Sequence, residues 1–305
     1  MSHSPLSPFP SRRRFLQWTG AVAATGLLGG EVAVGAKKKA AKAKEAQSDA
    51  TVVANVPASS EKKFPFRLGI ASYTFRKFDL AQTIAWTNRL GIKYLCLKSS
   101  HLPLDATPEK CAEVAEQIRK AGLVLYGGGT ITMKKEADVS QAFDYAKAAG
   151  MKVMIASPVP DVLPLINEKV QQYDIAIAIH NHGHGDKDYP TPQSVYEKIK
   201  DLDKRVGLCV DIGHTVRIVA DLLDSMRQCA DRILDVHLKD VTAASKEGKA
   251  AIAGRGVIDL PAVIRLLREI NYQGIASFEY EAGLDEPLPG LAESIGYVRG
   301  IMAAS

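Results

Sequence analysis

The histidines of this 305-residue sequence are concentrated in short polar segments that also contain carboxylates. Four such segments follow one another along the chain: His180-Asn181-His182, Asp211-Ile212-Gly213-His214, His237-Leu238-Lys239-Asp240 and Glu279-Tyr280-Glu281. Imidazole nitrogens combined with carboxylate oxygens suit a divalent ion such as Mn²⁺, Co²⁺, Zn²⁺ or Mg²⁺. The same groups can move protons as acids and bases. Either chemistry requires elements that bring the four segments to one place.

Each polar segment comes at or just after the end of a short apolar run. Eight such runs are typical of β-strands, at residues 67–74, 93–98, 123–127, 152–157, 175–180, 206–212, 234–239 and 275–280. Helical patterns separate them; Thr107-Pro108, for example, is an N-cap followed by proline at the first helical position. Alternating strands and helices predict parallel strands joined by right-handed crossovers. Eight units in about 240 residues predict a closed (β/α)8 TIM barrel, a single domain over residues 64–305.

An open, doubly wound sheet is the competing architecture. The first predicted strand is not followed by the G-x-G-x-x-G of a dinucleotide-binding sheet, which disfavours that fold. The run Gly127-Gly128-Gly129 ends the third predicted strand, but it lacks the Lys-Ser/Thr of a P-loop. We interpret this run as a loop in which the backbone makes a close approach or takes unusual dihedral angles.

Active sites of TIM barrels lie at the C-terminal ends of the strands. The four polar segments would meet there, and Lys98 and His101 follow the second predicted strand at the same end. Arg255 lies between two glycines, where the backbone can approach a ligand closely, and it could clamp an anion or a hydroxyl group. The residues that we expect to contact a substrate are His214, Lys239, Arg255, Lys98 and His101. Lys239 could instead hold a carboxylate ligand.

The net charge of +5 comes from the N-terminal region. Residues 1–63 hold ten basic and four acidic residues, a balance of +6, which leaves 29 basic and 30 acidic residues and a balance of −1 for residues 64–305. A nucleic-acid-binding domain should carry a basic surface, so nucleic acid is not expected as a partner. The four cysteines contain no C-x-x-C pair and are interpreted as buried small apolar residues.

The N-terminus resembles a twin-arginine (Tat) export signal. Ser11-Arg12-Arg13-Arg14-Phe15-Leu16-Gln17 is followed by a mildly apolar stretch, and Val34-Gly35-Ala36 offers small residues for cleavage after Ala36. Residues 1–36 are therefore predicted to be a Tat signal peptide, which implies transport of a folded protein to the periplasm by the Tat translocon. Residues 37–63, rich in Lys and Ala, are predicted to be a flexible linker.

Residues 64–305 resemble the xylose isomerase-like TIM barrels, the sugar phosphate isomerase/epimerase superfamily that also includes apurinic endonuclease IV. The resemblance rests on five segments in order, which are His180-Asn181-His182-Gly183, Val210-Asp211-Ile212-Gly213-His214, Asp235-Val236-His237-Leu238-Lys239-Asp240, Gly254-Arg255-Gly256-Val257-Ile258-Asp259 and Phe278-Glu279-Tyr280-Glu281. It implies one divalent metal ion held by Asp211, His237 and Glu279. The usual fourth ligand is a glutamate ending the fifth strand, and here His180, or His182 two residues on and facing the same way, takes its place.

The two resemblances together imply an exported sugar isomerase or epimerase that removes a proton beside a metal-bound carbonyl. Glu279 and His182 are the residues that we expect to be catalytic. Epimerases of the family use two glutamates as acid and base, and one of them is replaced here. A 3-keto-glycoside lyase or dehydratase is therefore an alternative, as is a non-catalytic sugar-binding barrel. An endonuclease is disfavoured because residues 241–275 contain no further histidine. The expected partner is a small sugar or glycoside. The sequence is also compatible with a homodimer.

Overall fold

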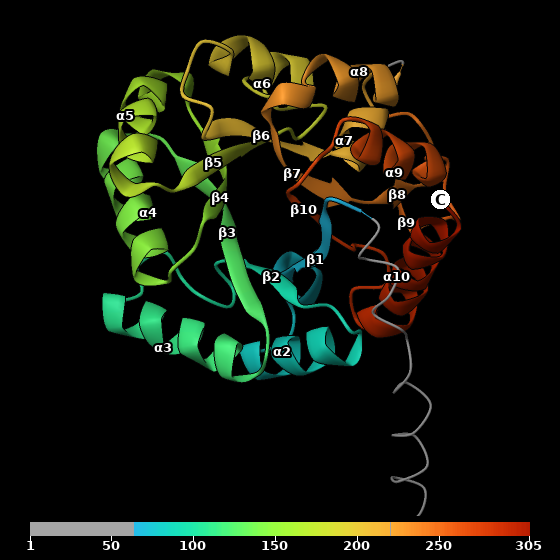
Figure 1. Ribbon diagram of the computed structural model, residues 1–305, viewed down its shortest axis with the longest axis horizontal. Helices are drawn as coiled ribbons and strands as arrows, with labels where there is room; N and C mark the ends of the chain where they lie inside the picture. Colours follow the sequence, from blue (N-terminus) through green and yellow to red (C-terminus); the bar gives the residue numbers. More distant parts are fainter. Residues whose placement is uncertain (1–63, 220) are drawn as a thin grey trace, which may run out of the picture. The chain divides into compact units, whose positions relative to one another are not determined.

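The computed structural model describes residues 64–219 and 221–305, so the signal peptide and linker predicted for residues 1–63 lie outside the described residues. Eight parallel strands of this part form a closed barrel in the order β1-β10-β7-β6-β5-β4-β3-β2 (Figure 1). They are β1 (Arg67–Ala71), β2 (Tyr94–Leu97), β3 (Val124–Met133), β4 (Val153–Pro158), β5 (Ala176–His180), β6 (Val206–Asp211), β7 (Ile233–Leu238) and β10 (Ile275–Phe278). The predicted (β/α)8 TIM barrel is thereby confirmed.

Helices surround the barrel as an outer ring, which Figure 1 shows in sequence order around the strands. They are α2 (Leu80–Arg89), α3 (Pro108–Lys120), α4 (Glu136–Ala148), α5 (Leu163–Tyr173), α6 (Pro192–Ile199), α7 (Ile212–Val216), α8 (Leu222–Gln228), α9 (Leu260–Glu269) and α10 (Pro287–Ala304). Three 3₁₀ turns, η2 (Ser72–Phe75), η3 (Pro160–Val162) and η4 (Ala230–Arg232), and a small antiparallel pair, β8 (Asp240–Val241) and β9 (Ala250–Ala251), complete the described elements. Among these helices, none has the length and apolarity needed to cross a membrane.

Polar side chains fix where the helices begin. The Thr107 side chain accepts a hydrogen bond from the Lys110 amide at 3.3 Å, and proline follows it at the first helical position of α3. The Asp79 side chain caps α2 in the same way, accepting from the Gln82 amide at 2.8 Å. These contacts satisfy amides that have no partner inside the helix. The capping signals in the sequence therefore place the helices, and the turns before them, at the predicted positions.

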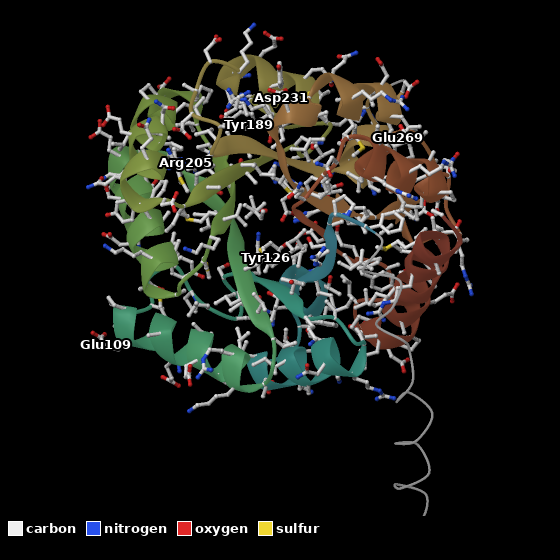
Figure 2. All side chains as sticks on the ribbon, in the orientation of Figure 1. Glu109, Tyr126, Tyr189, Arg205, Asp231 and Glu269 are labelled. Carbon is white, nitrogen blue, oxygen red and sulfur yellow. The ribbon has the colours of Figure 1, made fainter. Side chains whose placement is uncertain are left out.

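The core has two layers. The larger one lies between the strands and the helices, and a smaller cluster inside the barrel contains Cys96, Tyr126, Ile155, Ala178 and Cys209. Figure 2 shows Tyr126 inside the ring of strands, whereas Glu109 and Glu269 lie on the outer helices. All four cysteines are buried and free. The interior of the barrel is thus packed with side chains, as in other TIM barrels, and contains polar atoms as well as apolar ones.

The glycine run does not form the loop that the sequence suggested, because β3 continues through it to Met133. The pairing of β3 with β4 shifts register between Gly128 and Ile131. A Cβ atom on Gly127 would lie 2.7 Å from the carbonyl oxygen of Val153 on β4. The glycines are therefore explained by a close approach of two strand backbones within the barrel wall.

At the opposite end of the barrel from the polar segments, a buried arginine holds the connection from α6 to β6. Only 2% of Arg232 is exposed, and its guanidinium donates to the carbonyl oxygens of Lys200, Leu202, Asp203 and Val206 at 2.5 to 3.0 Å. Planar donors in a fixed fork suit several carbonyls at once. Residues at this face of a TIM barrel contribute to stability and not to catalysis.

The substitution Arg232→Met should therefore destabilise the barrel without altering the polar end. It leaves several carbonyls buried without donors, which we expect to cost about 3 kcal/mol of unfolding free energy. Thermal unfolding followed by circular dichroism measures the effect. Arg227→Met is the matched control, because Arg227 is half-exposed and its guanidinium lies 3.8 Å from Glu269. Equal melting temperatures for the two variants would contradict the role given to Arg232.

Candidate active site

Four side chains from neighbouring strands meet at the C-terminal end of the barrel. His180, Asp211 and His237 lie at or near the ends of β5, β6 and β7, and Glu279 follows β10 directly. One nitrogen or oxygen atom of each lies within 4.8 Å of those of the other three, and all four residues are buried. The imidazoles of His180 and His237 are 3.1 Å apart between Nε2 and Nδ1. The strand-end positions predicted from the sequence thus converge on one point.

The orientation of Asp211 is fixed by its neighbours. Its Oδ1 accepts a hydrogen bond from the His214 amide at 2.7 Å and caps α7. Its own amide donates to Oδ1 of Asn181 at 3.1 Å, and the Asn181 side chain in turn donates to Thr215 at 3.1 Å. Oδ2 faces the other three side chains, and the positive group beside it is the Lys239 ammonium, with Nζ at 2.9 Å. A buried carboxylate oxygen held in this way is available to a cation.

The ammonium group of Lys239 lies inside this cluster. Its Nζ is 2.9 Å from Oδ2 of Asp211, 2.6 Å from Oε2 of Glu279 and 2.6 Å from Oε1 of Glu281. The sequence offered two roles for Lys239, a contact with the substrate or with a carboxylate ligand, and the structure places it between the carboxylates. Three acids around one buried ammonium form a network in which the positive charge compensates the desolvation of the carboxylates.

The surroundings shift the pKa values of His180 and His237 in opposite directions. Burial lowers the pKa of His180 to about 3, so its ring is neutral and carries a free lone pair. Burial also opposes charge on His237, but Glu279, Asp235 and Asp211 outweigh it and raise its pKa. His237 is the histidine that must release a proton if its Nδ1 is to donate electrons to a cation.

The two carboxylates remain ionised despite their burial. Burial alone would raise the pKa of Asp211, but Lys239 and His214 hold it well below its usual range. Lys239 and His237 do the same to the pKa of Glu279. Both groups therefore offer full negative charges to a positive partner.

The residues present fit a divalent metal ion. Two carboxylates and two imidazoles form a mixed oxygen and nitrogen set that suits Mn²⁺, Co²⁺, Zn²⁺ or Mg²⁺. A positive group already lies between Asp211 and Glu279, in the form of the Lys239 ammonium. Because Lys239 also contacts Glu281, it keeps an anionic partner if an ion takes its place between the other two acids.

Two more histidines line the rim. The His182 ring lies 4.4 Å from the His180 ring and 6.0 Å from the His214 ring, measured between centroids. Its Nδ1 is 3.0 Å from Oδ2 of Asp186, whose Oδ1 accepts from the amides of Asp188 and Tyr189 at 2.9 Å. A carboxylate fixed in this way holds the Nδ1 proton and leaves the lone pair of His182 on Nε2.

The sequence suggested Asp186, like Glu281, only as a possible second base, and not as the partner of His182. Asp186 lies in an irregular loop, between β5 and α6, whose conformation is not encoded in a periodic pattern. The glycines at 183 and 185 on either side of His184 were the available signal, since both adopt positive φ angles and allow the loop to turn back on itself.

Two of the residues expected to contact a substrate, Lys98 and His101, lie in different surroundings. Lys98 is half-buried beside Tyr73. Burial lowers the pKa of its ammonium group, although the negative charge of Glu279 opposes this shift. His101 is buried, with Nδ1 2.9 Å from Ser72 and Nε2 3.0 Å from Thr83. Nζ of Lys98 donates to the carbonyl oxygen of Thr130 at 3.4 Å, whereas both ring nitrogens of His101 are engaged in holding the η2 segment against α2.

Arg255 is not brought to the cluster. Its exposed guanidinium pairs with Glu293 on α10, with Nη2 2.8 Å from Oε2. The amides of the flanking glycines, Gly254 and Gly256, each donate a hydrogen bond to Oδ2 of Asp240 at 2.9 Å. The glycine-flanked loop is therefore built around a buried carboxylate, and its arginine points outward.

Two inward-facing residues lie one step deeper in the barrel than the ligand cluster. Cys209 and Asp235 precede Asp211 and His237 by two positions on β6 and β7, so they share the inward face. Burial raises the pKa of Asp235 to about 7. Its Oδ1 is 3.6 Å from Sγ of Cys209 and 3.9 Å from Nε2 of His237. Strand alternation was the signal that could have identified both.

Comparison with solved structures finds the same fold in enzymes of different activity. The 3-keto-D-glucoside 4-epimerase of E. coli is 16% identical, with a TM-score of 0.61 over 77% of this chain and 99% of that one. A probable 3-DHS dehydratase of Bacillus anthracis, involved in petrobactin synthesis, is 12% identical, with a TM-score of 0.60 over 77% and 98%. At these identities the likeness shows the fold alone.

Among curated proteins, an uncharacterized protein of Methanocaldococcus jannaschii is 34% identical over 92 residues. The match covers 29% of this chain and 31% of the relative's length. A match over so small a part of both proteins does not indicate an activity for this chain.

Two family models match the chain. The twin-arginine translocation signal matches residues 10–29, so the Tat signal read from the sequence is confirmed and the chain is exported by that pathway. The model of the xylose isomerase-like TIM barrels matches residues 76–301, which include every residue of the cluster described above. The chain therefore belongs to the xylose isomerase-like TIM barrel family.

Proposed function

We propose that the chain is an exported, divalent-metal-dependent sugar isomerase or epimerase. The observation that carries the proposal is the convergence of His180, Asp211, His237 and Glu279 on one point at the mouth of the barrel. One ion held there would polarise the carbonyl group of a sugar and so acidify the neighbouring C–H bond. The small sugar or glycoside would lie above the cluster, in contact with the rim.

The side chains of this site would have two roles, which are binding the ion and transferring protons. Asp211, His180 and His237 have their donor atoms deep in the barrel and would hold the ion. Glu279 also faces the mouth and would take the proton from carbon. Lys239 would keep its ion pair with Glu281 and would compensate negative charge in the site when the substrate binds. His214 and Lys98 would bind hydroxyl groups of the substrate.

His182 is the second proton-transfer group that we propose. Its Nε2 has no hydrogen-bond partner in the described part of the chain, and Asp186 holds the other ring nitrogen. A base oriented by a carboxylate is suited to general acid–base catalysis. This histidine would supply the group that a second glutamate supplies in related epimerases.

The replacement of glutamate by His180 favours a second candidate, a 3-keto-glycoside lyase or dehydratase. A neutral imidazole buried at this position can hold an ion but does not match a carboxylate in shuttling protons across both faces of a sugar. The fold is shared with an enzyme named as an epimerase and with one named as a probable dehydratase. Both reactions start with removal of the same proton, and they differ in whether a neighbouring group then leaves.

Metal binding is tested by Asp211→Asn. The loss of one charged ligand should remove most of the bound ion while the barrel stays folded, because Asn still caps a helix well. Elemental analysis of protein folded in the cytoplasm and dialysed against Mn²⁺ measures the content. Asp79→Asn is the matched control, since Asp79 caps α2 and lies outside the cluster. Full metal content in Asp211→Asn would refute the ligand assignment.

Turnover is tested with a panel of ketoses and 3-keto-glycosides in D₂O. We expect deuterium to enter beside the carbonyl group, a chelator to stop the exchange, and Mn²⁺ or Co²⁺ to restore it. Elimination products would assign the lyase, and rearranged sugars the isomerase or epimerase. Absence of exchange across the panel by folded, metal-loaded protein would favour a non-catalytic sugar-binding barrel and contradict the proposal.

The same assay measures the role of His182. His182→Asn should lower kcat about 100-fold, in the usual range for losing a general acid or base. His184→Asn is the control two residues away, because His184 is exposed and its Nε2 contacts the carbonyl oxygen of Arg217 at 3.1 Å. Equal kcat values for the two variants would remove His182 from the catalytic set.

A further inference from the structure

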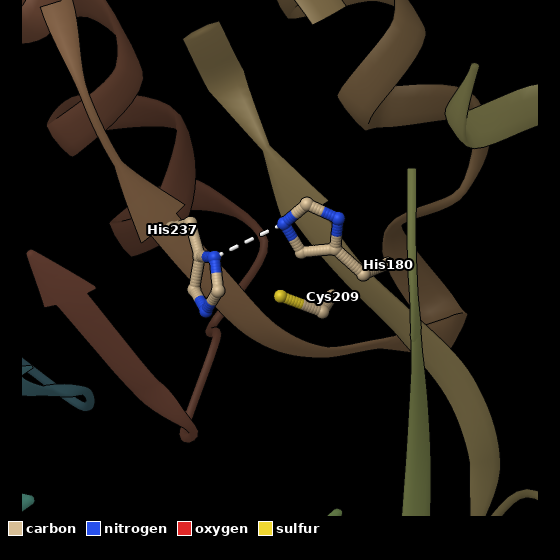
Figure 3. A group of neighbouring side chains, drawn as sticks. All are labelled: His180, Cys209 and His237. Carbon is tan, nitrogen blue, oxygen red and sulfur yellow. Dashed lines mark hydrogen bonds between the residues drawn. The ribbon is translucent and has the colours of Figure 1, made fainter. Parts of the chain in front are cut away.

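A second set of donor atoms lies beneath the carboxylates. His180, Cys209 and His237 are all buried, and one donor atom of each lies within 4.8 Å of the other two. Figure 3 shows the thiol of Cys209 beside the two imidazole rings, which face each other across the dashed contact. The three residues come from the adjacent strands β5, β6 and β7, and His180 pairs with Cys209 in the sheet register.

The two imidazoles are shared by two different sets. Towards the mouth they face the carboxylates of Asp211 and Glu279, and towards the interior they face the thiol of Cys209. Because side chains alternate along a strand, Cys209 and Asp211 point to the same face and differ in depth by two residues. The pair of imidazoles therefore has carboxylate oxygens on its outer side and the sulfur of Cys209 on its inner side.

The thiol has little else to bind in the described structure. Sγ of Cys209 contacts Oδ1 of Asp235 at 3.6 Å, which is a weak interaction for a thiol. Nδ1 of His180 and Nε2 of His237 are buried without a hydrogen-bond partner among the described residues. Buried polar atoms are normally satisfied, so two unpartnered imidazole nitrogens on the residues of this set call for a ligand.

Sulfur changes which ions the centre prefers. Two imidazoles and one thiolate suit Zn²⁺ and other thiophilic ions, whereas carboxylates suit Mn²⁺ and Mg²⁺. Tetrahedral geometry with Zn–S near 2.3 Å and Zn–N near 2.0 Å places such donors about 3.5 Å apart. Small side-chain rotations would close the donors from within 4.8 Å to that separation.

We propose that His180, Cys209 and His237 form an inner site for a thiophilic divalent ion, with the Cys209 sulfur as a direct ligand. The inference rests on the proposed function in one respect, that the two imidazoles can also hold an ion with Asp211 and Glu279. When the ion binds, the Cys209 proton passes to solvent and a metal–sulfur bond forms. Because the imidazoles are shared, inner and outer sites exclude each other, and a thiophilic ion inhibits turnover supported by Mn²⁺.

The test uses Cd²⁺ and Co²⁺ with the folded barrel prepared without metal. Titration of the parent protein should produce a sulfur-to-metal charge-transfer absorption that saturates at one ion per chain. Cys209→Ser should abolish the absorption and weaken Cd²⁺ binding about 100-fold, while Mn²⁺ affinity, measured by electron paramagnetic resonance of free Mn²⁺, changes by less than about threefold. Cys96→Ser is the matched control, since Cys96 is equally buried inside the barrel and lies outside the donor set.

The outcomes separate this inference from the proposed function. If the parent binds Mn²⁺ but gives no charge-transfer absorption, or if Cys209→Ser keeps it, the inner site is wrong and the outer metal centre stands. If the parent binds neither Mn²⁺ nor Cd²⁺, both are wrong. Should Cys209→Ser fail to fold, an anomalous-scattering peak of cadmium within bonding distance of the parent's Sγ supports the inner site, and a peak only between Asp211 and Glu279 overturns it.

Discussion

The arrangement of this site depends on compensation of buried negative charge. Asp211 and Glu279 are held in the barrel with almost no exposure to water, and isolated carboxylates are very costly to bury. The chain supplies one positive group, Lys239, between them. Their ionisation, the raised pKa of His237 and the neutrality of His180 all follow from this balance of burial against neighbouring charge. An ion entering the cluster would act within the same balance and release Lys239 towards Glu281.

The barrel creates this environment through strand alternation and closure. Parallel strands end at one rim, so residues far apart in sequence, such as His180 and Glu279, become neighbours. The period of two then stacks Cys209 beneath Asp211, and Asp235 beneath His237. At the other end of the barrel, Arg232 performs a different task, since its guanidinium donates hydrogen bonds to backbone carbonyls. Stability and chemistry are thereby assigned to opposite ends of the same strands.

The sequence predicts the architecture and the strand-end residues well, because both depend on local patterns. Apolar runs, caps and prolines identify the strands and helix starts, and strand ends locate Asp211 and His237. Residues whose placement depends on tertiary contacts are harder to predict. His101 is enclosed by hydroxyl groups, and Arg255 turns outward to Glu293. Neither contact has a signature within a short segment.

The central claim is that His180, Asp211, His237 and Glu279 hold one divalent ion and that Lys239 gives way to it. A crystal structure of the protein grown with Mn²⁺, phased so that the anomalous signal of manganese is mapped, tests both parts at once. The account predicts one anomalous peak within bonding distance of all four side chains, with Nζ of Lys239 moved away from Asp211 and still on Glu281. A cluster without a peak, with Lys239 still between Asp211 and Glu279, would contradict it.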